Sequence, residues 1–162
     1  MINDFSAGRM LICGDMPDEI TVGGVLYRIN SDMRTVLRVI HYIEEGMDIE
    51  DAAGIFWAEV PADRKKAAEI MTAFIGEEYI PQKDTKSAFS FYRDAAFIIG
   101  GFMECYGIDI TADNMHWFRF RALFSALDGS CAFSRLIVCR TAKYSAAEEK
   151  LAARRIRMKY GG

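Results

Sequence analysis

The two histidines and four cysteines are the side chains best suited to nucleophilic, acid–base or metal chemistry, and their spacing supports none of these. His41 lies within an apolar helical pattern with Glu45 as its acidic neighbour one turn on, and His116 lies near an expected helix start. The cysteines form no Cys-x-x-Cys motif, and the closest two, Cys131 and Cys139, are eight residues apart. We therefore expect no catalytic residue, no metal site, no cofactor, and neither a disulfide scaffold nor a zinc ribbon.

The adjacent carboxylate pairs and the short sequence motifs do not indicate an enzyme either. Glu44-Glu45 and Glu77-Glu78 are adjacent, so on a helix their side chains point in different directions and make a poor acid–base pair. The sequence lacks His-Glu-x-x-His, Gly-x-Ser-x-Gly and Gly-x-x-x-x-Gly-Lys, which mark zinc peptidases, serine hydrolases and P-loop proteins. We expect a protein that is not an enzyme.

Aromatic and basic side chains alternate over residues 116–121, His-Trp-Phe-Arg-Phe-Arg, a pattern that can stack on bases and neutralise phosphates. On a helix, however, these aromatic residues spread over several faces. That spread is more typical of a helix buried between partners, with Arg119 and Arg121 reaching outward or pairing with carboxylates. The formal net charge of −3 also argues against a nucleic-acid binder. Nucleic-acid binding is therefore the weaker alternative.

Charge is divided unevenly along the chain. Residues 140–162 carry seven basic side chains against two acidic ones, a net charge of +5, and the preceding 139 residues carry a net charge of −8. The simplest interpretation is that these basic residues solvate a last helix and suit the negative end of its dipole. The alternative is contact between copies or with an acidic partner. The residues that would meet in such a contact are Arg154, Arg155, Arg157 and Lys159 of one copy and Glu44, Glu45, Asp48, Glu50 and Asp51 of its neighbour.

The hydrophobic pattern predicts a mainly α protein that begins with a β-hairpin. Residues 19–22 and 25–29 are β-rich runs on either side of Gly23-Gly24, and both central residues of a type I′ turn need a positive φ. Helices are expected over residues 32–45, 48–58, 61–76, 91–106, 111–127, 132–139 and 146–159. The expected N-caps include Ser31, Thr111 and Ser145.

The segment Phe91–Tyr106 is apolar almost all round, so we expect it to be the central helix of a bundle. Gly100 and Gly101 within it cost helix propensity, about 1 kcal/mol each, so a close helix–helix contact is expected there. Gly107 predicts a left-handed glycine ending for this helix.

Length and composition fit one domain of 162 residues, 51% hydrophobic and 27% charged. We expect a single helical bundle of about six or seven helices with a small antiparallel hairpin over residues 18–162, preceded by an N-terminal arm over residues 1–17. The longest charge-free stretch is nine residues, 95–103, well short of the roughly 20 that a membrane span needs. No signal peptide is evident, so a soluble intracellular protein is expected.

Several stretches are similar to a small family of phage proteins. They are residues 20–34, 89–95, 106–110 and 116–124, together with Arg140. The most specific signatures are Tyr-Gly-Ile-Asp from Tyr106 and His-Trp-x-x-Phe-x-Ala-Leu from His116, and an Asn-x-Asp-x-Arg motif begins at Asn30. Over roughly residues 18–160 the chain resembles the bacteriophage gene product fifteen family, found in tailed phages and prophages of Gram-positive bacteria.

The resemblance implies a tail assembly chaperone, encoded beside the tape-measure gene, that binds the tape-measure protein in the bacterial host cytoplasm. The alternative within the same setting is a structural subunit retained in the virion tail. The family supplies no catalytic residue. We also expect copies to associate along an extended client, because one small domain cannot cover a long helix; the competing picture is a monomer whose last helix folds back onto its own acidic surface.

Overall fold

The computed structural model describes residues 14, 16–82 and 87–141, and these fall into two compact units. Unit 1 comprises the described residues up to Ser87 together with Ile108–Ala126, and unit 2 comprises Ala88–Gly107 and the described residues from Leu127 onward. Among the described residues there are six α-helices and one antiparallel hairpin, which confirms the predicted mainly α fold. None of these helices is long and apolar enough to cross a membrane.

Some expectations fall on residues that the structure does not describe. The helix expected over residues 146–159 lies outside the described residues, and so does most of the arm expected over residues 1–17. The single domain over residues 18–162 stays a prediction.

The hairpin forms as its glycines predict. In unit 1, β1 (Glu19–Val22) pairs with β2 (Val25–Arg28) in an antiparallel register. Gly23 and Gly24 at its turn have φ values of 60° and 85°, both in the left-handed region that a type I′ turn requires. Alternate residues of β1 are buried, so one face of the hairpin packs on the rest of unit 1.

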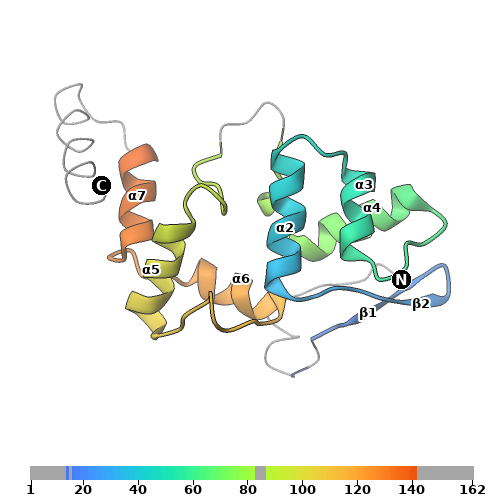
Figure 1. Ribbon diagram of the computed structural model, residues 1–162, viewed down its shortest axis with the longest axis horizontal. Helices are drawn as coiled ribbons and strands as arrows, with labels where there is room; N and C mark the ends of the chain where they lie inside the picture. The colour runs from blue at the N-terminus through green and yellow to red at the C-terminus, as the bar shows by residue number, and fades with distance from the viewer. Residues whose placement is uncertain (1–13, 15, 83–86, 142–162) are drawn as a thin grey trace. The chain divides into compact units, whose positions relative to one another are not determined.

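Four helices complete unit 1: α2 (Met33–Glu44), α3 (Ile49–Phe56), α4 (Arg64–Ile75) and α6 (Trp117–Ser125). A short 3₁₀ turn, η1 (Glu77–Tyr79), follows α4. Figure 1 shows α3 beside α2 and α4, in agreement with its packing against both. The core of this unit is aromatic, with fully buried side chains at Phe56, Trp57, Phe74, Trp117, Phe118 and Phe120.

Two predicted N-caps are wrong. The carboxylate of Asp32 accepts the N–H of Thr35 at 3.0 Å and so caps α2, while the hydroxyl of Ser31 donates to the carboxylate of Asp18 instead. Thr111 does not cap a helix either, because its N–H is bound by the carboxylate of Asp109 in a turn. The helix predicted over residues 111–127 therefore begins only at α6.

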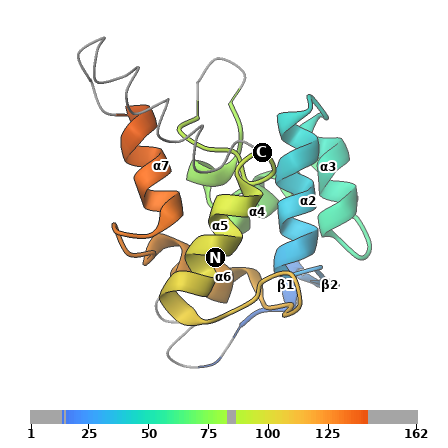
Figure 2. The ribbon, with the colours of Figure 1, turned by 60° about the vertical axis from the view of Figure 1, so that its left-hand side comes forward.

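Unit 2 contains α5 (Ala95–Tyr106) and α7 (Ala132–Thr141), which lie side by side in Figures 1 and 2. Ile98 and Phe102 of α5 are buried, as predicted. The expected burial on all sides is wrong, however, because Met103 is 48% exposed. The helix also starts four residues later than predicted, because the residues before Ala95 form a turn.

Glycines lie in the middle and at the end of α5. A Cβ on Gly101 would meet the Sγ of Cys131 at 3.4 Å and the methyl groups of Leu127 at 3.6 Å, which are ordinary contacts with the segment between α6 and α7. A Cβ on Gly100 would meet nothing within 4 Å, so the close helix–helix contact predicted at this glycine is wrong. Gly107 has a φ of 64°, and its N–H donates to the carbonyl of Met103 at 3.1 Å, which confirms the predicted left-handed ending.

Candidate interaction surfaces

The aromatic side chains of the 116–121 run lie inside unit 1. Trp117, Phe118 and Phe120 have no exposed area. The indole N–H of Trp117 donates to the carbonyl of Ile75 at 2.9 Å, and the ring of Phe118 stacks on that of Phe74 with centroids 4.6 Å apart. Buried rings cannot stack on bases, so the nucleic-acid alternative loses the platform on which it rested.

Arg121 completes the same contact with the end of α4. One of its guanidinium nitrogens donates to the carbonyl of Ile75 at 3.3 Å, and the guanidinium carbon lies 5.2 Å from the centre of the Phe118 ring. Trp117 and Arg121 thus both supply donors to a carbonyl that the helix itself leaves unpaired. In residues 116–121, Trp117 and Arg121 therefore hold α6 against the end of α4.

His116 acts as a helix cap. Its Nδ1 accepts the N–H of Phe118 at 3.1 Å, and its Nε2 lies 3.3 Å from the carbonyl of Pro17, so a neutral ring protonated on Nε2 satisfies both partners. Burial lowers the pKa of His116, against the opposing influence of the Pro17 carbonyl and the charge of Asp18. A proton on Nδ1 would remove the cap.

The Asn-x-Asp-x-Arg motif also closes unit 1 on itself. The side-chain amide of Asn30 donates to the carbonyl of Ile55 at 2.9 Å, near the end of α3. Asp32 caps α2, and the guanidinium of Arg34 donates to the carbonyl of Thr111 at 2.7 Å. All three polar side chains therefore satisfy backbone groups of the fold.

An ion pair joins the two helices of unit 2. The guanidinium nitrogens of Arg140 lie 2.6 and 2.8 Å from the two carboxylate oxygens of Asp94, a bidentate pair. Asp94 is 3% exposed and also accepts the N–H of Ser90 at 3.0 Å. Burial acts to raise the pKa of Asp94, but these hydrogen bonds and the charges of Arg140 and Arg93 outweigh it and hold the pKa below its ordinary value.

The remaining candidates for chemistry are not brought together. No group of three or more His, Cys, Asp or Glu side chains that could hold a metal ion occurs within residues 14, 16–82 and 87–141. Cys131 is buried with its Sγ 3.4 Å from the hydroxyl of Ser134, and Cys105 and Cys139 are half-buried thiols. His41 lies on α2, far along the sequence from all of them.

The five acidic residues expected to bind a partner lie on the segment where α2 ends and α3 begins (Figure 1). Glu44 and Glu45 close α2, Asp48 caps α3 through the N–H of Glu50 at 2.8 Å, and Asp51 follows in the first turn of α3. The sequence contains no lysine or arginine between residues 39 and 63. We call residues 42–51 the acidic corner.

The acidic corner also exposes three large apolar side chains, which the hydrophobic pattern did not indicate as a surface. Tyr42 is 39% exposed, and Met47 and Ile49 are each 38% exposed. Met47 and Ile49 alternate with acidic residues between two helices, and that alternation is the signal that could have marked them. Apolar groups ringed by charge are typical of protein-binding surfaces.

Two helix ends in unit 1 carry charges that their own dipoles disfavour. Glu44 and Glu45 lie at the C-terminal end of α2, and Arg64, Lys65 and Lys66 form the first turn of α4. A charge of the favourable sign contributes about 0.3–1 kcal/mol at a helix end, and the opposite sign costs a similar amount. The basic cluster on α4 was not singled out from the sequence.

In unit 2 the outer face of α5 is apolar and small. Ala96 is exposed, a Cβ on Gly100 would meet nothing within 4 Å, and Met103 lies on the same face. Glu104 is the one charged residue of this helix, and its carboxylate is bound to the N–H of Ala132 at 2.9 Å. We call Ala96, Gly100 and Met103 the α5 face.

The basic residues expected to meet the acidic corner lie beyond the described part of the chain. They are Arg154, Arg155, Arg157 and Lys159. Their contact with the corner stays a prediction.

These features define a helical protein whose motif residues serve its own fold and whose exposed groups suit contacts with other proteins. A family model described as Bacteriophage Gp15 protein matches residues 55–161, more than half of the chain. The chain therefore belongs to this bacteriophage family, as the resemblance implied, and it is a phage structural or assembly protein. The matched range does not include residues 20–34, where the likeness stays a resemblance. Neither curated proteins nor solved structures gave a match.

Proposed function

We propose that this protein is a tail assembly chaperone that binds the tape-measure protein during phage tail morphogenesis. The observation that carries the proposal is the α5 face, because a helix with an apolar, small-residue outer side suits the docking of another helix. The flexible thioether of Met103 can adapt to varied apolar partners along a long client. Membership of a phage structural and assembly family supports the setting.

Co-expression with the tape-measure protein of the same phage tests this function. A chaperone should raise the fraction of tape-measure protein recovered in the soluble extract. A tape-measure protein that is equally soluble with and without this chain would overturn the proposal. Chaperone action should take place in the host cytoplasm, before the tail is complete.

A subunit that stays in the virion tail is the alternative, and the same family membership is compatible with it. Mass spectrometry of purified virions separates the two functions. A chaperone should be absent from the particles, whereas a tail subunit should be present in a fixed ratio to the tube protein.

We also propose that copies associate head to tail at the acidic corner. The basic C-terminal residues Arg154, Arg155, Arg157 and Lys159 supply positive charge of the right sign for this contact. Exposed ion pairs contribute only about 0–1 kcal/mol each, so the apolar side chains of the corner must contribute too. Sedimentation at low and high salt checks the association, which should weaken as salt screens the charges over about 8–10 Å.

A further inference from the structure

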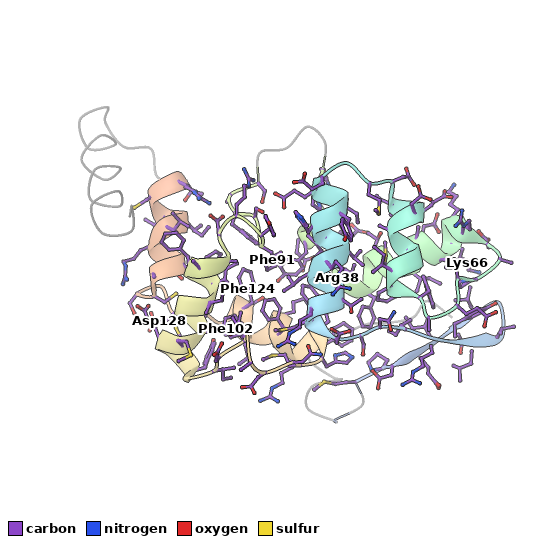
Figure 3. All side chains as sticks on the ribbon, in the orientation of Figure 1. Arg38, Lys66, Phe91, Phe102, Phe124 and Asp128 are labelled. Atoms are coloured by element: carbon purple, nitrogen blue, oxygen red, sulfur yellow. The ribbon has the colours of Figure 1, made fainter. Side chains whose placement is uncertain are left out.

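Two surfaces of unit 1 carry opposite charge at opposite ends of α3. The acidic corner lies at the start of α3, and Arg64, Lys65 and Lys66 lie at the start of α4, after the segment that follows the end of α3. The eight residues of α3 span about 12 Å, and residues 57–63 follow before α4 begins. Figure 3 shows Lys66 on α4, well away from Arg38 on α2.

The basic cluster has apolar neighbours on the hairpin. The carbonyl of Arg28 on β2 accepts the N–H of Ala58 at 3.0 Å, so β2 lies beside the segment that leads into α4. Val25 and Leu26 at the turn of the hairpin are 55% and 60% exposed. The basic end, as we call this surface, consists of Val25, Leu26, Arg28, Arg64, Lys65 and Lys66.

We propose that the basic end of one copy docks on the acidic corner of a second copy. This inference rests on the self-association proposed above, and it places Arg64, Lys65 and Lys66 at the corner in place of the C-terminal cations. Both surfaces expose apolar side chains. The corner carries five carboxylates, and Arg64, Lys65 and Lys66 give the basic end three adjacent cations, so the two sets of charges are complementary.

The helix dipoles give the contact a second physical reason. In one copy alone, Glu44 and Glu45 repel the negative end of α2, and Lys65 and Lys66 repel the positive end of α4. In the docked pair, each set of charges meets the opposite sign. Glu69, four residues after Lys65, can balance one cation locally, which leaves the others for the neighbour.

The contact joins two different patches, so it is heterologous and does not close between two copies. Repeated, it produces a ring or an open row of copies. A row suits a long helical client, because many weak contacts held in line on one client bind together more strongly than each does alone. Without the client, the association should be weak and should depend on salt.

Charge reversal at both surfaces tests the proposal with the full chain. The variants are Glu44→Lys/Glu45→Lys in the corner and Lys65→Glu/Lys66→Glu on α4. Both changes place charges that the helix dipoles favour, so neither variant should lower the midpoint of thermal unfolding. Each variant alone should sediment as a monomer at low salt, where the wild type forms larger species.

Mixing the variants sharpens the test. An equimolar mixture of the two should again form the larger species, because the unchanged basic end of the first variant matches the unchanged corner of the second, and the reversed corner matches the reversed basic end. A chain carrying all four reversals should again form the larger species.

The matched control is Arg154→Glu/Arg155→Glu, which should leave the association unchanged. Loss of association in this control with none in Lys65→Glu/Lys66→Glu would overturn the inference and keep self-association through the C-terminal cations. A wild type that is monomeric at every salt concentration, with and without the tape-measure protein, would remove self-association altogether, and the solubility of the tape-measure protein would still decide the chaperone function separately.

Discussion

Unit 1 and unit 2 are held together by different means. Unit 1 buries a continuous set of aromatic side chains, with Trp117 bonded to the end of α4 at its centre. The described residues of unit 2 bury far fewer large side chains, and the bidentate pair of Asp94 and Arg140 joins its helices α5 and α7. Opening a large apolar core has a high cost in free energy, whereas a small unit held by an ion pair opens at a lower cost. The two units are therefore suited to different tasks.

The outer surfaces of the two units also suit different tasks. Unit 1 presents charged patches at fixed helix ends, as orientation-specific contact between copies requires. Unit 2 presents the α5 face, which has little charge and tolerates varied apolar partners. We expect unit 1 to set the arrangement of copies and unit 2 to hold the client.

The largest expected effect comes from Trp117→Ala in unit 1. This change removes a fully buried indole and its bond to Ile75, and it should lower the free energy of unfolding by about 3–5 kcal/mol. Both tryptophans lie in unit 1, so the fluorescence of the remaining Trp57 reports this unit during urea unfolding. Tyr92→Ala, at a side chain that is 66% exposed, is the control and should change little.

In unit 2, Arg140→Met should lower the free energy of unfolding by about 2–3 kcal/mol, because it leaves the buried carboxylate of Asp94 without its charged partner. The far-ultraviolet circular dichroism should show the loss, and the midpoint of tryptophan fluorescence should stay in place. Arg135→Met, on the exposed side of α7, is the matched control. A fluorescence midpoint that moves as far as the dichroism would show that the two units unfold as one, against the comparison drawn above.

Local pattern was sufficient for the parts of this molecule that local chemistry decides. Gly23 and Gly24 alone specify the hairpin turn, and the carboxylates of the acidic corner are close in space because they are close in sequence. The short helix expected over residues 132–139 forms as α7 for the same reason. Each depends on contacts within a few residues.

The features that sequence patterns did not predict depend on contacts between residues far apart in the sequence. Ser31 and Asp32 can each cap a helix, and only the approach of Asp18 to Ser31 settles which one does. Asp94 and Arg140 are 46 residues apart, so no local pattern could pair them. The apolar pattern of α5 indicated burial on every side, because periodicity reports which residues are apolar and not which neighbours are present.

Acid should destabilise the two units at different pH values. The first loss of stability is expected in unit 1 and depends on His116. The pKa of His116 is lowered in the folded state, so the unfolded chain takes up its proton first as the pH falls below about 6.5. Between that pH and the lower folded value the ring stays neutral in the folded state and keeps the cap of α6, while unit 1 loses stability because the proton binds to the unfolded chain. Urea unfolding by tryptophan fluorescence at pH 7.5 and 5.5 measures the loss. His116→Asn keeps a capping side chain that does not titrate, and it should abolish the difference.

Because of Asp94, unit 2 should lose stability at a lower pH than unit 1. Its folded pKa lies below its ordinary value, so the contribution of the ion pair is complete above about pH 4 and is lost as the pH falls through the folded value. Dichroism should therefore show no loss of stability in unit 2 between pH 7.5 and 5.5. A loss in that range that survives in His116→Asn would contradict the assignment.

The variants with the smallest expected effect on stability give the most direct test of whether unit 1 arranges the copies and unit 2 holds the client. One pair of changes in unit 2 is Met103→Ser on the α5 face with Val138→Ser on α7, where Val138 is 54% exposed. The other pair is Met47→Ser with Ile49→Ser in the acidic corner. Each pair replaces exposed side chains and should change the free energy of unfolding by less than about 1 kcal/mol. The unit 2 pair should lower the recovery of soluble tape-measure protein and leave sedimentation at low salt unchanged, because it removes apolar contact with the client alone. The corner pair should weaken sedimentation of the larger species and leave most of the solubility. If the corner pair abolished solubility while the unit 2 pair had no effect, the client would bind the acidic corner, and the tasks of the two units would have to be exchanged.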